Sequence, residues 1–252
     1  MTDFSSARIL ITGAASGIGA ATARLLAERG ARLILMDRDA SGLSAFPDAA
    51  HIVGDVADPA LWVDADLTGL THAVINAGIG AGGPIEDMTF DEWRQVMTVN
   101  LDGAFLSLQA AMRAIRAADY AGDPPGGGIV ITASVAGMKP EPGIAAYAAS
   151  KAAVIQLARV AAKEGAAARI RVNVIAPGGV QTPIWSKQPF FQELIAAHGS
   201  EEAAYVALAG LATPLGRYAS AEEVAAQIAF LLSDDCAFTT GSVFVTDGGY
   251  SL

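Results

Sequence analysis

RILITGAASGIGAATARLLAERG, residues 8–30, contains the pattern that decides the fold. The apolar run RILIT at 8–12 is typical of a buried strand, and the glycine-rich turn TGAASGIG at 12–19 follows it directly. The residues after this turn are rich in Ala and Leu, which favours a helix. Glycines at 13, 17 and 19 allow a tight turn and a close backbone approach to a pyrophosphate at the helix N-terminus. An ordinary glycine turn is the alternative, but a position between strand and helix is the one that a dinucleotide site requires.

The same alternation of strand and helix continues along the chain. Further apolar runs predict strands at RLILM (32–36), HIVG (51–54), HAVIN (72–76), GIVITA (128–133), RVNVIA (171–176) and SVFVT (242–246). Helical patterns lie near 17–29, 91–118, 146–166 and 221–233. Most of the strands are continuously apolar, as strands covered on both faces are. The sequence therefore predicts an α/β fold, a doubly wound parallel sheet of the Rossmann type with about seven strands and helices on both faces, in a single domain over residues 1–252.

Three segments depart from the alternation. The link from 54 to 72 contains Pro59 and Gly69 and has room for a helix of only two or three turns. DPPGGG at 123–128 predicts a surface loop. Segment 177–219 is a long excursion for a compact domain, and we expect a substrate lid within it at about 183–212.

Composition limits the classes of function. A net charge of −10 argues against a nucleic-acid partner, and no apolar stretch approaches the ~20 residues that cross a bilayer. We expect a cytoplasmic protein without a signal peptide. Cys236 is the only cysteine and is expected to be a structural thiol. His51, His72 and His198 have no ligand spacing, so no metal site is expected.

The end of the second predicted strand indicates the cofactor. Asp37 lies eighteen residues beyond Gly19, where a carboxylate accepts hydrogen bonds from both ribose hydroxyls of an adenosine. The same charge would repel a 2′-phosphate by roughly a few kcal/mol. Arg38 offers the alternative, because an arginine there can bind that phosphate or stack on the adenine. The carboxylate occupies the ribose position itself, so the sequence favours NAD over NADP.

Polar and small residues end the third and fourth predicted strands. Asp55, in GDV, is placed to meet the adenine amino group, and Asn76 is placed to tie neighbouring strands together through its amide. Ala77 and Gly78 leave room for a cofactor. Each of these residues alone is explained equally well as a cap or turn. Their common location counts, because ligands of doubly wound sheets bind at the carboxyl ends of the strands.

SVAGMKPEPGIAAYAASK, residues 134–151, carries the groups for proton transfer. Tyr147 and Lys151, at i and i+4 in a predicted helix, project from one face, and Ser134 arrives from the end of the preceding strand. A free tyrosine has a pKa of ~10, and a neighbouring ammonium is expected to lower it toward the working pH. The alternative is a Tyr and a Lys on an ordinary surface helix.

With these motifs assembled, the chain resembles the short-chain dehydrogenase/reductase family in its form of roughly 250 residues. TGAASGIG resembles the family's TGxxxGxG, INAG at 75–78 its NNAG, and PGGVQT at 177–182 its PGxxxT. Asn100, Ser134, Tyr147 and Lys151 stand where the family's catalytic four stand. Two features depart from the family pattern: Ile75 replaces an Asn, and the region between the third and fourth strands is short.

The resemblance implies hydride transfer between a nicotinamide ring and a carbonyl or alcohol carbon. Tyr147 would act as general acid or base, Lys151 would lower its pKa and bind the nicotinamide ribose, and Ser134 would position the substrate oxygen. Asn100, at a kink in the long helix 91–118, would hold a water that links Lys151 to solvent. The implied cofactor contacts are Gly13, Ser16, Gly17, Ile18, Gly19, Asp37, Arg38, Asp55, Val56, Asn76, Ala77, Gly78, Tyr147, Lys151, Pro177, Gly178, Val180 and Thr182.

The substrate is expected between the loop 135–146 and the lid. Besides Ser134 and Tyr147, its candidate contacts are apolar: Met138, Ile144, Trp185 and Phe190. These four predict a secondary alcohol or ketone with an apolar body, because no Arg or Lys cluster lies there beyond Lys187. The alternative is that they pack the lid onto its own domain.

Two rival functions and an oligomeric state complete the expectations. A 3-oxoacyl-(acyl carrier protein) reductase would share the catalytic four but prefer NADPH and show a basic docking patch. A cofactor-binding regulator without turnover could keep the glycine-rich turn while losing Tyr147, Lys151 or Ser134, and none of these is lost here. The family usually forms tetramers, so the resemblance implies a homotetramer through the long helices and the C-terminal strand; the Ala-rich faces in 101–118 and 146–166 permit close helix approach.

Overall fold

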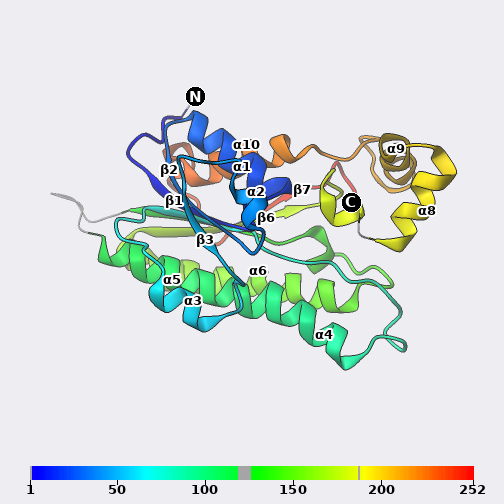
Figure 1. Cartoon of the computed structure of the whole chain (residues 1–252), viewed down its shortest axis with the longest axis horizontal. Helices are drawn as coiled ribbons and strands as arrows, with labels where there is room; N and C mark the ends of the chain where they lie inside the picture. The colour runs from blue at the N-terminus through cyan, green and yellow to red at the C-terminus, as the bar shows by residue number, and fades with distance from the viewer. Residues whose placement is uncertain (1, 119–125, 187) are drawn as a thin grey trace.

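In the computed structural model, which describes residues 2–118, 126–186 and 188–252, seven parallel strands form one sheet (Figure 1). The strands lie in the order β3-β2-β1-β4-β5-β6-β7. Strands β2 and β3 are therefore added on one side of β1 and strands β4 to β7 on its other side, so the strand order reverses between β1 and β4. Their bounds are β1 Arg8–Thr12, β2 Arg32–Asp37, β3 Ala50–Val53, β4 His72–Ile75, β5 Gly127–Thr132, β6 Ile170–Pro177 and β7 Val243–Thr246. The predicted doubly wound parallel sheet is confirmed.

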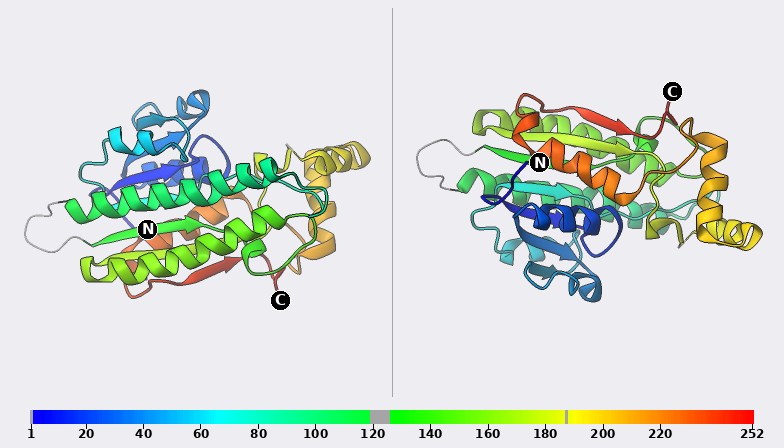
Figure 2. Two further views of the ribbon diagram at one scale, coloured as in Figure 1. Left: turned by 90° about the horizontal axis from the view of Figure 1, so that it is seen from below. Right: turned by 90° about the horizontal axis from the view of Figure 1, so that it is seen from above.

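Helices cover both faces of the sheet. α1 (Gly17–Glu28) and α10 (Ala221–Leu232) pack together on one face, and α5 (Gly103–Ala117) and α6 (Ala145–Gly165) cover the other (Figures 1 and 2). α4 (Phe90–Met97) continues into α5 through a π-helical segment, Thr98–Asp102. Short helices are α2 (Ala40–Leu43), α3 (Pro59–Asp64) and α7 (Pro183–Ser186), while α8 (Pro189–His198) and α9 (Glu201–Ala212) form a pair at one end of the molecule.

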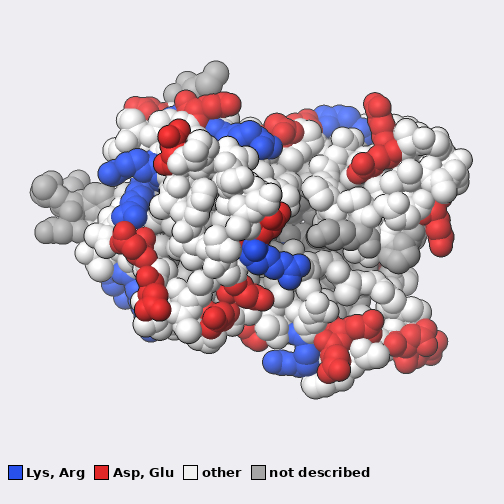
Figure 3. Space-filling model, viewed as in Figure 1, with Lys and Arg blue, Asp and Glu red and all other residues white. Residues whose placement is uncertain are grey.

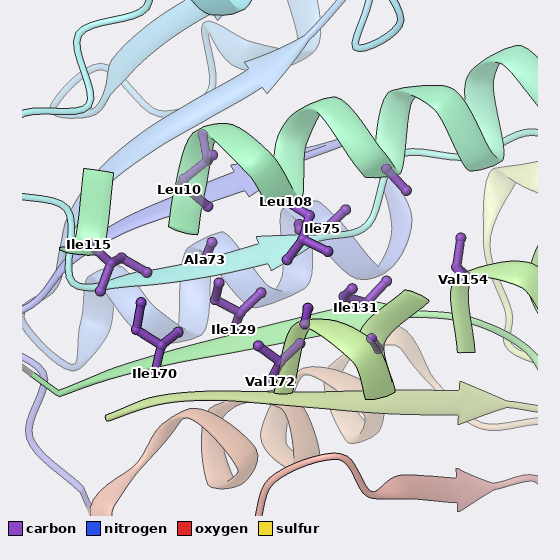
Figure 4. Close-up of a cluster of buried hydrophobic side chains, with 14 of the residues drawn as sticks. Leu10, Ala73, Ile75, Leu108, Ile115, Ile129, Ile131, Val154, Ile170 and Val172 are labelled. Carbon is purple, nitrogen blue, oxygen red and sulfur yellow. The ribbon is translucent and has the colours of Figure 1, made fainter. Parts of the chain in front are cut away.

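The strand sequences explain the two layers of core. Successive side chains of a strand point to opposite faces, so Leu10 joins the cluster under α5 and α6, whereas Ile9 and Ile11 join the cluster under α1 and α10. Figure 4 shows the first of these clusters, in which Ile129 and Ile131 of β5 meet residues of the covering helices. Every residue of β5 is buried, which accounts for its unbroken apolar run.

The structure corrects three sequence expectations. The helix between β3 and β4 has six residues, Pro59–Asp64, which is fewer than two turns. The predicted loop 123–128 ends earlier than expected, because Gly127 and Gly128 already pair with β6 in the sheet; residues 123–125 lie outside the described residues. The predicted helix 91–118 is divided into α4, the π-helical segment and α5.

Charge is distributed without a continuous basic region on the face shown in Figure 3, where the described Lys and Arg side chains are interspersed with Asp and Glu. Among the described residues, no helix is long and apolar enough to cross a bilayer.

Candidate active site

The carboxyl ends of β1, β2, β4, β5 and β6 meet at one edge of the sheet, and the glycine-rich turn lies at the point where the strand order reverses. Gly13 and Gly17 have φ values of 66° and 54°, which favour glycine. A Cβ at Gly13 would lie 2.8 Å from Ala77 Cα, and one at Gly19 would clash with the Gly13 carbonyl. Within the described chain, the Ser16 side chain makes no capping hydrogen bond, so it leaves the first N–H groups of α1 uncapped.

The exit of β4 is fastened to the glycine-rich turn. Asn76 Nδ2 donates to the Gly13 carbonyl at 3.2 Å, which confirms the expected tie between neighbouring strands. Thr12 adds a second tie that the sequence analysis did not assign. Its Oγ1 accepts hydrogen bonds from the backbone N–H groups of Asn76 (3.0 Å) and Ala77 (3.2 Å). The turn and the β4 exit therefore form one rigid floor.

Asp37, the last residue of β2, lies beside the glycine-rich turn. One carboxylate oxygen accepts from Ala15 N and the other from Asp39 N, both at 3.0 Å. Each oxygen keeps a lone pair for a further donor. Arg38 is exposed on the neighbouring position. The carboxylate is thus held against the glycine-rich turn by backbone donors, and its negative charge is fixed there.

The two candidates after β3 have local partners. Asp55 is exposed and accepts from Ala57 N at 2.9 Å, which closes a turn. Val56 is buried and fills the space that the glycine at 103 leaves on α5. Its carbonyl accepts from Trp62 Nε1 at 2.8 Å. These contacts support the alternative interpretation of Asp55 as a turn residue and give Val56 a packing role. The contact of Asp55 with an adenine and that of Val56 with the cofactor stay predictions.

Ser134 and Tyr147 meet at the end of β5. Ser134 is 8% exposed; its hydroxyl accepts from Ala136 N at 3.1 Å and contacts the Pro177 carbonyl at 3.4 Å. Burial raises the pKa of the Tyr147 phenol, and a hydrogen bond with Ser134 opposes that rise. The expected depression of this pKa is therefore wrong for the chain by itself, since desolvation disfavours the phenolate more than its neighbours favour it.

Lys151 lies beneath the phenol. It is 4% exposed, its Nζ donates to the Thr132 carbonyl at 2.9 Å, and Nζ lies 5.6 Å from the centroid of the Tyr147 ring. Burial lowers the pKa of Lys151 to about 8. A Cβ on Gly78 would lie 3.4 Å from Nζ, so the ammonium also borders the β4 exit.

Asn100 lies in the π-helical segment, where the resemblance placed a kink. Its Oδ1 accepts from Ile79 N at 2.8 Å, and its Nδ2 donates to Ile79 O at 3.0 Å and to Ser150 Oγ at 3.1 Å. Both amide protons therefore have protein partners, which leaves only a lone pair of Oδ1 for a water. Ser150, which the sequence analysis did not assign, donates in turn to the Tyr147 carbonyl at 2.7 Å and so links Asn100 to the helix of Tyr147 and Lys151.

The segment after β6 forms the opposite wall. Gly178 N donates to Thr246 O at 3.0 Å, and Val180 is buried. Thr182 reaches the glycine-rich turn, because a Cβ on Gly17 would lie 3.3 Å from Thr182 Cγ2. Pro177 ends β6 beside Ser134. The structure thus brings this segment to the same edge as the glycine-rich turn.

The four apolar substrate candidates differ in their packing and exposure. Trp185 packs within the lid segment, with its ring 5.6 Å from Tyr218 and 6.2 Å from the fully buried Phe191, and its Nε1 donates to Val180 O. This supports the alternative interpretation for Trp185. Met138 is 52% exposed, and Phe190 is 45% exposed although it forms an edge-on aromatic pair with Trp185, with 6.1 Å between the ring centroids. Ile144 is partly buried.

The cations near the expected substrate position differ from the sequence expectation, which named Lys187 alone. Lys187 lies outside the described residues. Lys139, which follows Met138, is a further cation beyond the expected one, and its ammonium lies 3.3 Å from the Glu141 carboxylate. Among the described residues, no three His, Cys, Asp or Glu side chains gather in a way that would hold a metal. Burial lowers the pKa of His72 to about 4, so this imidazole is neutral.

A parallel sheet with a glycine-rich turn at its reversal point and polar side chains at the strand ends defines the Rossmann class of nucleotide-binding folds. The sequence profile of the family described as Enoyl-(Acyl carrier protein) reductase matches residues 13–251. Together with the relatives below, this match shows that the chain belongs to the short-chain dehydrogenase/reductase family. Dehydrogenases of this family use a nicotinamide nucleotide cofactor.

Several relatives match over nearly their full length. The chain is 37% identical to a cis-4-hydroxycyclohexanecarboxylate dehydrogenase from Sinomonas cyclohexanicum, covering 96% of this chain and 95% of that protein. It is 38% identical to a cyclohexanol dehydrogenase from an Acinetobacter species, covering 98% and 96%. Among solved structures, a levodione reductase shares 35% identity with a TM-score of 0.84 over 98% of each chain.

Proposed function

We propose that this protein is an oxidoreductase that transfers a hydride between NAD(H) and a secondary alcohol or ketone with an apolar, ring-shaped body. The observation that carries this proposal is the meeting of Ser134, Tyr147 and Lys151 at the sheet edge that also holds the glycine-rich turn. A proton-transfer group beside a dinucleotide site is the arrangement that alcohol oxidation requires.

The residues at this edge fit a dinucleotide. The cradle at Gly13 and Gly19 has no room for a Cβ, and the uncapped start of α1 offers N–H groups to a pyrophosphate. Asp37 would hold the adenosine ribose, and the β4 exit and the segment 177–182 would border the rest of the molecule. When bound, NAD supplies the hydride acceptor for oxidation, and NADH the hydride donor for reduction.

The chain itself would handle the proton. In the oxidation direction, Tyr147 would accept the hydroxyl proton of the alcohol at its phenolic oxygen while its own phenolic proton passes to the neutral amine of Lys151, which lies beneath the ring. Ser134 would hydrogen-bond the same substrate oxygen and stabilise its developing charge. Asn100 and Ser150 keep the turn of α6 that carries both residues in place.

The pH dependence of the reaction follows from the two shifted groups. Because the pKa of Tyr147 is raised and that of Lys151 is lowered to about 8, Lys151 gives up the first proton as the pH rises. The Tyr147–Lys151 pair can accept the proton of an alcohol only after it has lost this first proton. We expect kcat/KM for oxidation to rise about tenfold per pH unit up to about pH 8 and then level, whereas kcat/KM for reduction should be level up to about pH 8 and fall about tenfold per pH unit above it. Initial rates in both directions would check this, and a flat profile contradicts it.

The substrate class rests on the apolar wall and on the relatives. Met138 and Phe190 offer exposed apolar surface, and the Lys139 charge is matched by Glu141. Two relatives are named for cyclohexane compounds: cyclohexanol, which is neutral, and 4-hydroxycyclohexanecarboxylate, which carries a carboxylate. The relatives thus support the ring, and the matched charge of Lys139 supports a neutral body. We therefore expect a neutral ring alcohol or ketone.

A substrate panel tests this proposal. Purified protein would be assayed for NADH formation with cyclohexanol, a short linear secondary alcohol, 4-hydroxycyclohexanecarboxylate and a sugar phosphate. We expect the highest kcat/KM with cyclohexanol. Activity with the anionic compounds alone would contradict the substrate class, and no turnover with any alcohol or ketone would contradict the function.

A second candidate is an NADPH-dependent 3-oxoacyl-(acyl carrier protein) reductase. One relative, from Thermotoga maritima, bears that name and is 36% identical over 95% of this chain. Against this candidate stand the carboxylate of Asp37 and the net charge of −10, which repels an acidic carrier protein. Reduction of an acyl-carrier substrate with NADPH in preference to cyclohexanone with NADH would favour it.

The lid, the assembly and the location complete the proposal. Helices α7, α8 and α9 have a small core of their own around Phe191, which supports a role of residues 183–212 as a lid on the single catalytic domain. A homotetramer is supported by exposed apolar side chains on α5, α6 and β7: Phe105, Val160, Phe244 and Val245. The cytoplasmic location stays a prediction.

A further inference from the structure

The last residues of the chain form a closed turn. The Asp247 carboxylate accepts hydrogen bonds from Gly249 N at 2.9 Å and from Ser251 N at 2.8 Å. Gly248 and Gly249 have φ values of 62° and 89°, which a side chain at either position would strain. The path of the backbone up to Tyr250 is therefore fixed.

This turn is packed against the wall of the active site. The N–H of Gly178, in the segment after β6, donates to Thr246 O at 3.0 Å, and a Cβ on Gly178 would lie 2.8 Å from Asp247 Cβ. On the other side, Leu215 N donates to Gly248 O at 3.1 Å, at the connection between α9 and α10. The turn is thus anchored to two segments that border the proposed cofactor and lid.

Tyr250 extends from this anchor to a third segment, the substrate-side loop of residues 138–144. Lys139 Nζ lies 3.8 Å from the centroid of the Tyr250 ring and donates to the Tyr250 carbonyl at 3.0 Å. The Tyr250 hydroxyl donates to Glu141 Oε1 at 2.6 Å, and the same carboxylate pairs with Lys139 at 3.3 Å. Figure 2 shows the red C-terminal end of the chain beside the green loop that follows β5.

These contacts form a network, unlike an isolated surface ion pair. The Lys139 and Glu141 side chains are 36% and 34% exposed, so solvent weakens each charge interaction only in part. Three residues share four interactions, one of them through the Tyr250 carbonyl, and these include a cation–π contact and a short hydrogen bond to a carboxylate. Within the loop, Gly143 O accepts from Gly83 N at 2.7 Å, which holds the far end of the loop.

The loop carries the groups that would meet the substrate. It begins at Met138, one residue before Lys139, and runs directly into Ile144 at the start of the Tyr147 helix. We propose that Tyr250 is a positioning residue: clasped by Lys139 and Glu141, it holds the substrate-side loop against the active site and thereby sets the KM for the alcohol. This inference rests on the proposed function, because it takes Met138 and Ile144 as part of the substrate wall.

The test compares Tyr250→Ala and Glu141→Gln with the intact protein and with Leu252→Ala, a change at a fully exposed residue of the same tail. Steady-state kinetics with cyclohexanol and NAD would give the two KM values and kcat. Hydrogen–deuterium exchange would report the protection of amides in 138–144 and of Gly83 without requiring turnover. We expect Tyr250→Ala to raise the KM for the alcohol about tenfold, the effect of one hydrogen bond to a charged group, and to leave the KM for NAD unchanged.

Hydrogen–deuterium exchange of the amides in 138–144 should become about tenfold faster in Tyr250→Ala. The acceleration should be smaller in Glu141→Gln and absent in Leu252→Ala. An unchanged alcohol KM together with unchanged loop protection in Tyr250→Ala would overturn the inference. A loss of protection spread evenly over the chain would overturn it too, because Tyr250 would then support the fold in general. Should the intact protein turn over no alcohol, the proposed function fails, and the exchange measurement alone decides whether Tyr250 holds the loop.

Discussion

Replacing Tyr147 by Phe is expected to lower kcat for alcohol oxidation by about 10³-fold, within the range that a general acid or base contributes. The change removes only the phenolic oxygen that hydrogen-bonds with Ser134 and keeps the ring above Lys151. Since burial disfavours the phenolate, no fold stability depends on ionisation of this group. NAD affinity, measured by NADH fluorescence titration, and the Tm should therefore stay near those of the intact protein.

Tyr218→Phe is the matched control for the loss of a phenolic oxygen. The Tyr218 ring packs against Trp185 and Tyr205 of the lid segment. We expect it to retain most of its turnover. Full catalytic speed in Tyr147→Phe would contradict the proposed mechanism, because another group would then have to move the proton.

Replacing Asp37 by Ser is expected to shift the cofactor preference from NAD toward NADP. The carboxylate is held at the mouth of the glycine-rich turn by Ala15 N and Asp39 N. Loss of its hydrogen bonds to the ribose should lower kcat/KM for NAD by about 10- to 100-fold. Loss of its charge removes a repulsion of roughly a few kcal/mol toward a 2′-phosphate, so kcat/KM for NADP should rise.

Asp39→Ser, two residues away, is the control. Asp39 caps the short helix α2, and a serine keeps the ability to cap. The ratio of kcat/KM for the two cofactors should change in Asp37→Ser and not in Asp39→Ser. A preference of the intact protein for NADPH would show that the assignment of NAD is wrong and would favour the acyl-carrier reductase.

The sheet was predictable because the residue types within each strand indicate whether one or both of its faces are buried. β5 is buried on both faces and reads as an unbroken apolar run, and the glycine-rich turn places β1 before α1. The tie from Asn76 to Gly13 was also predictable, because both lie at strand ends that a parallel sheet brings together.

Features that depend on tertiary contacts were not predictable in the same way. The pKa of Tyr147 is raised because burial outweighs the effects of its neighbours, and burial is not set by the spacing of Tyr147 and Lys151. Ser150 on α6 meets Asn100 in the π-helical segment across 50 positions of sequence. Tyr250 and Glu141 are 109 positions apart, and no local pattern connects them.

The most direct measurement of the central claim follows a label. The protein would oxidise cyclohexanol carrying deuterium at the carbinol carbon in the presence of NAD, and mass spectrometry of the recovered NADH would locate the deuterium. The proposed hydride transfer predicts one deuterium in each NADH formed and a slower reaction than with unlabelled alcohol. Unlabelled NADH, with the deuterium released to water, would contradict direct transfer and with it the proposed function.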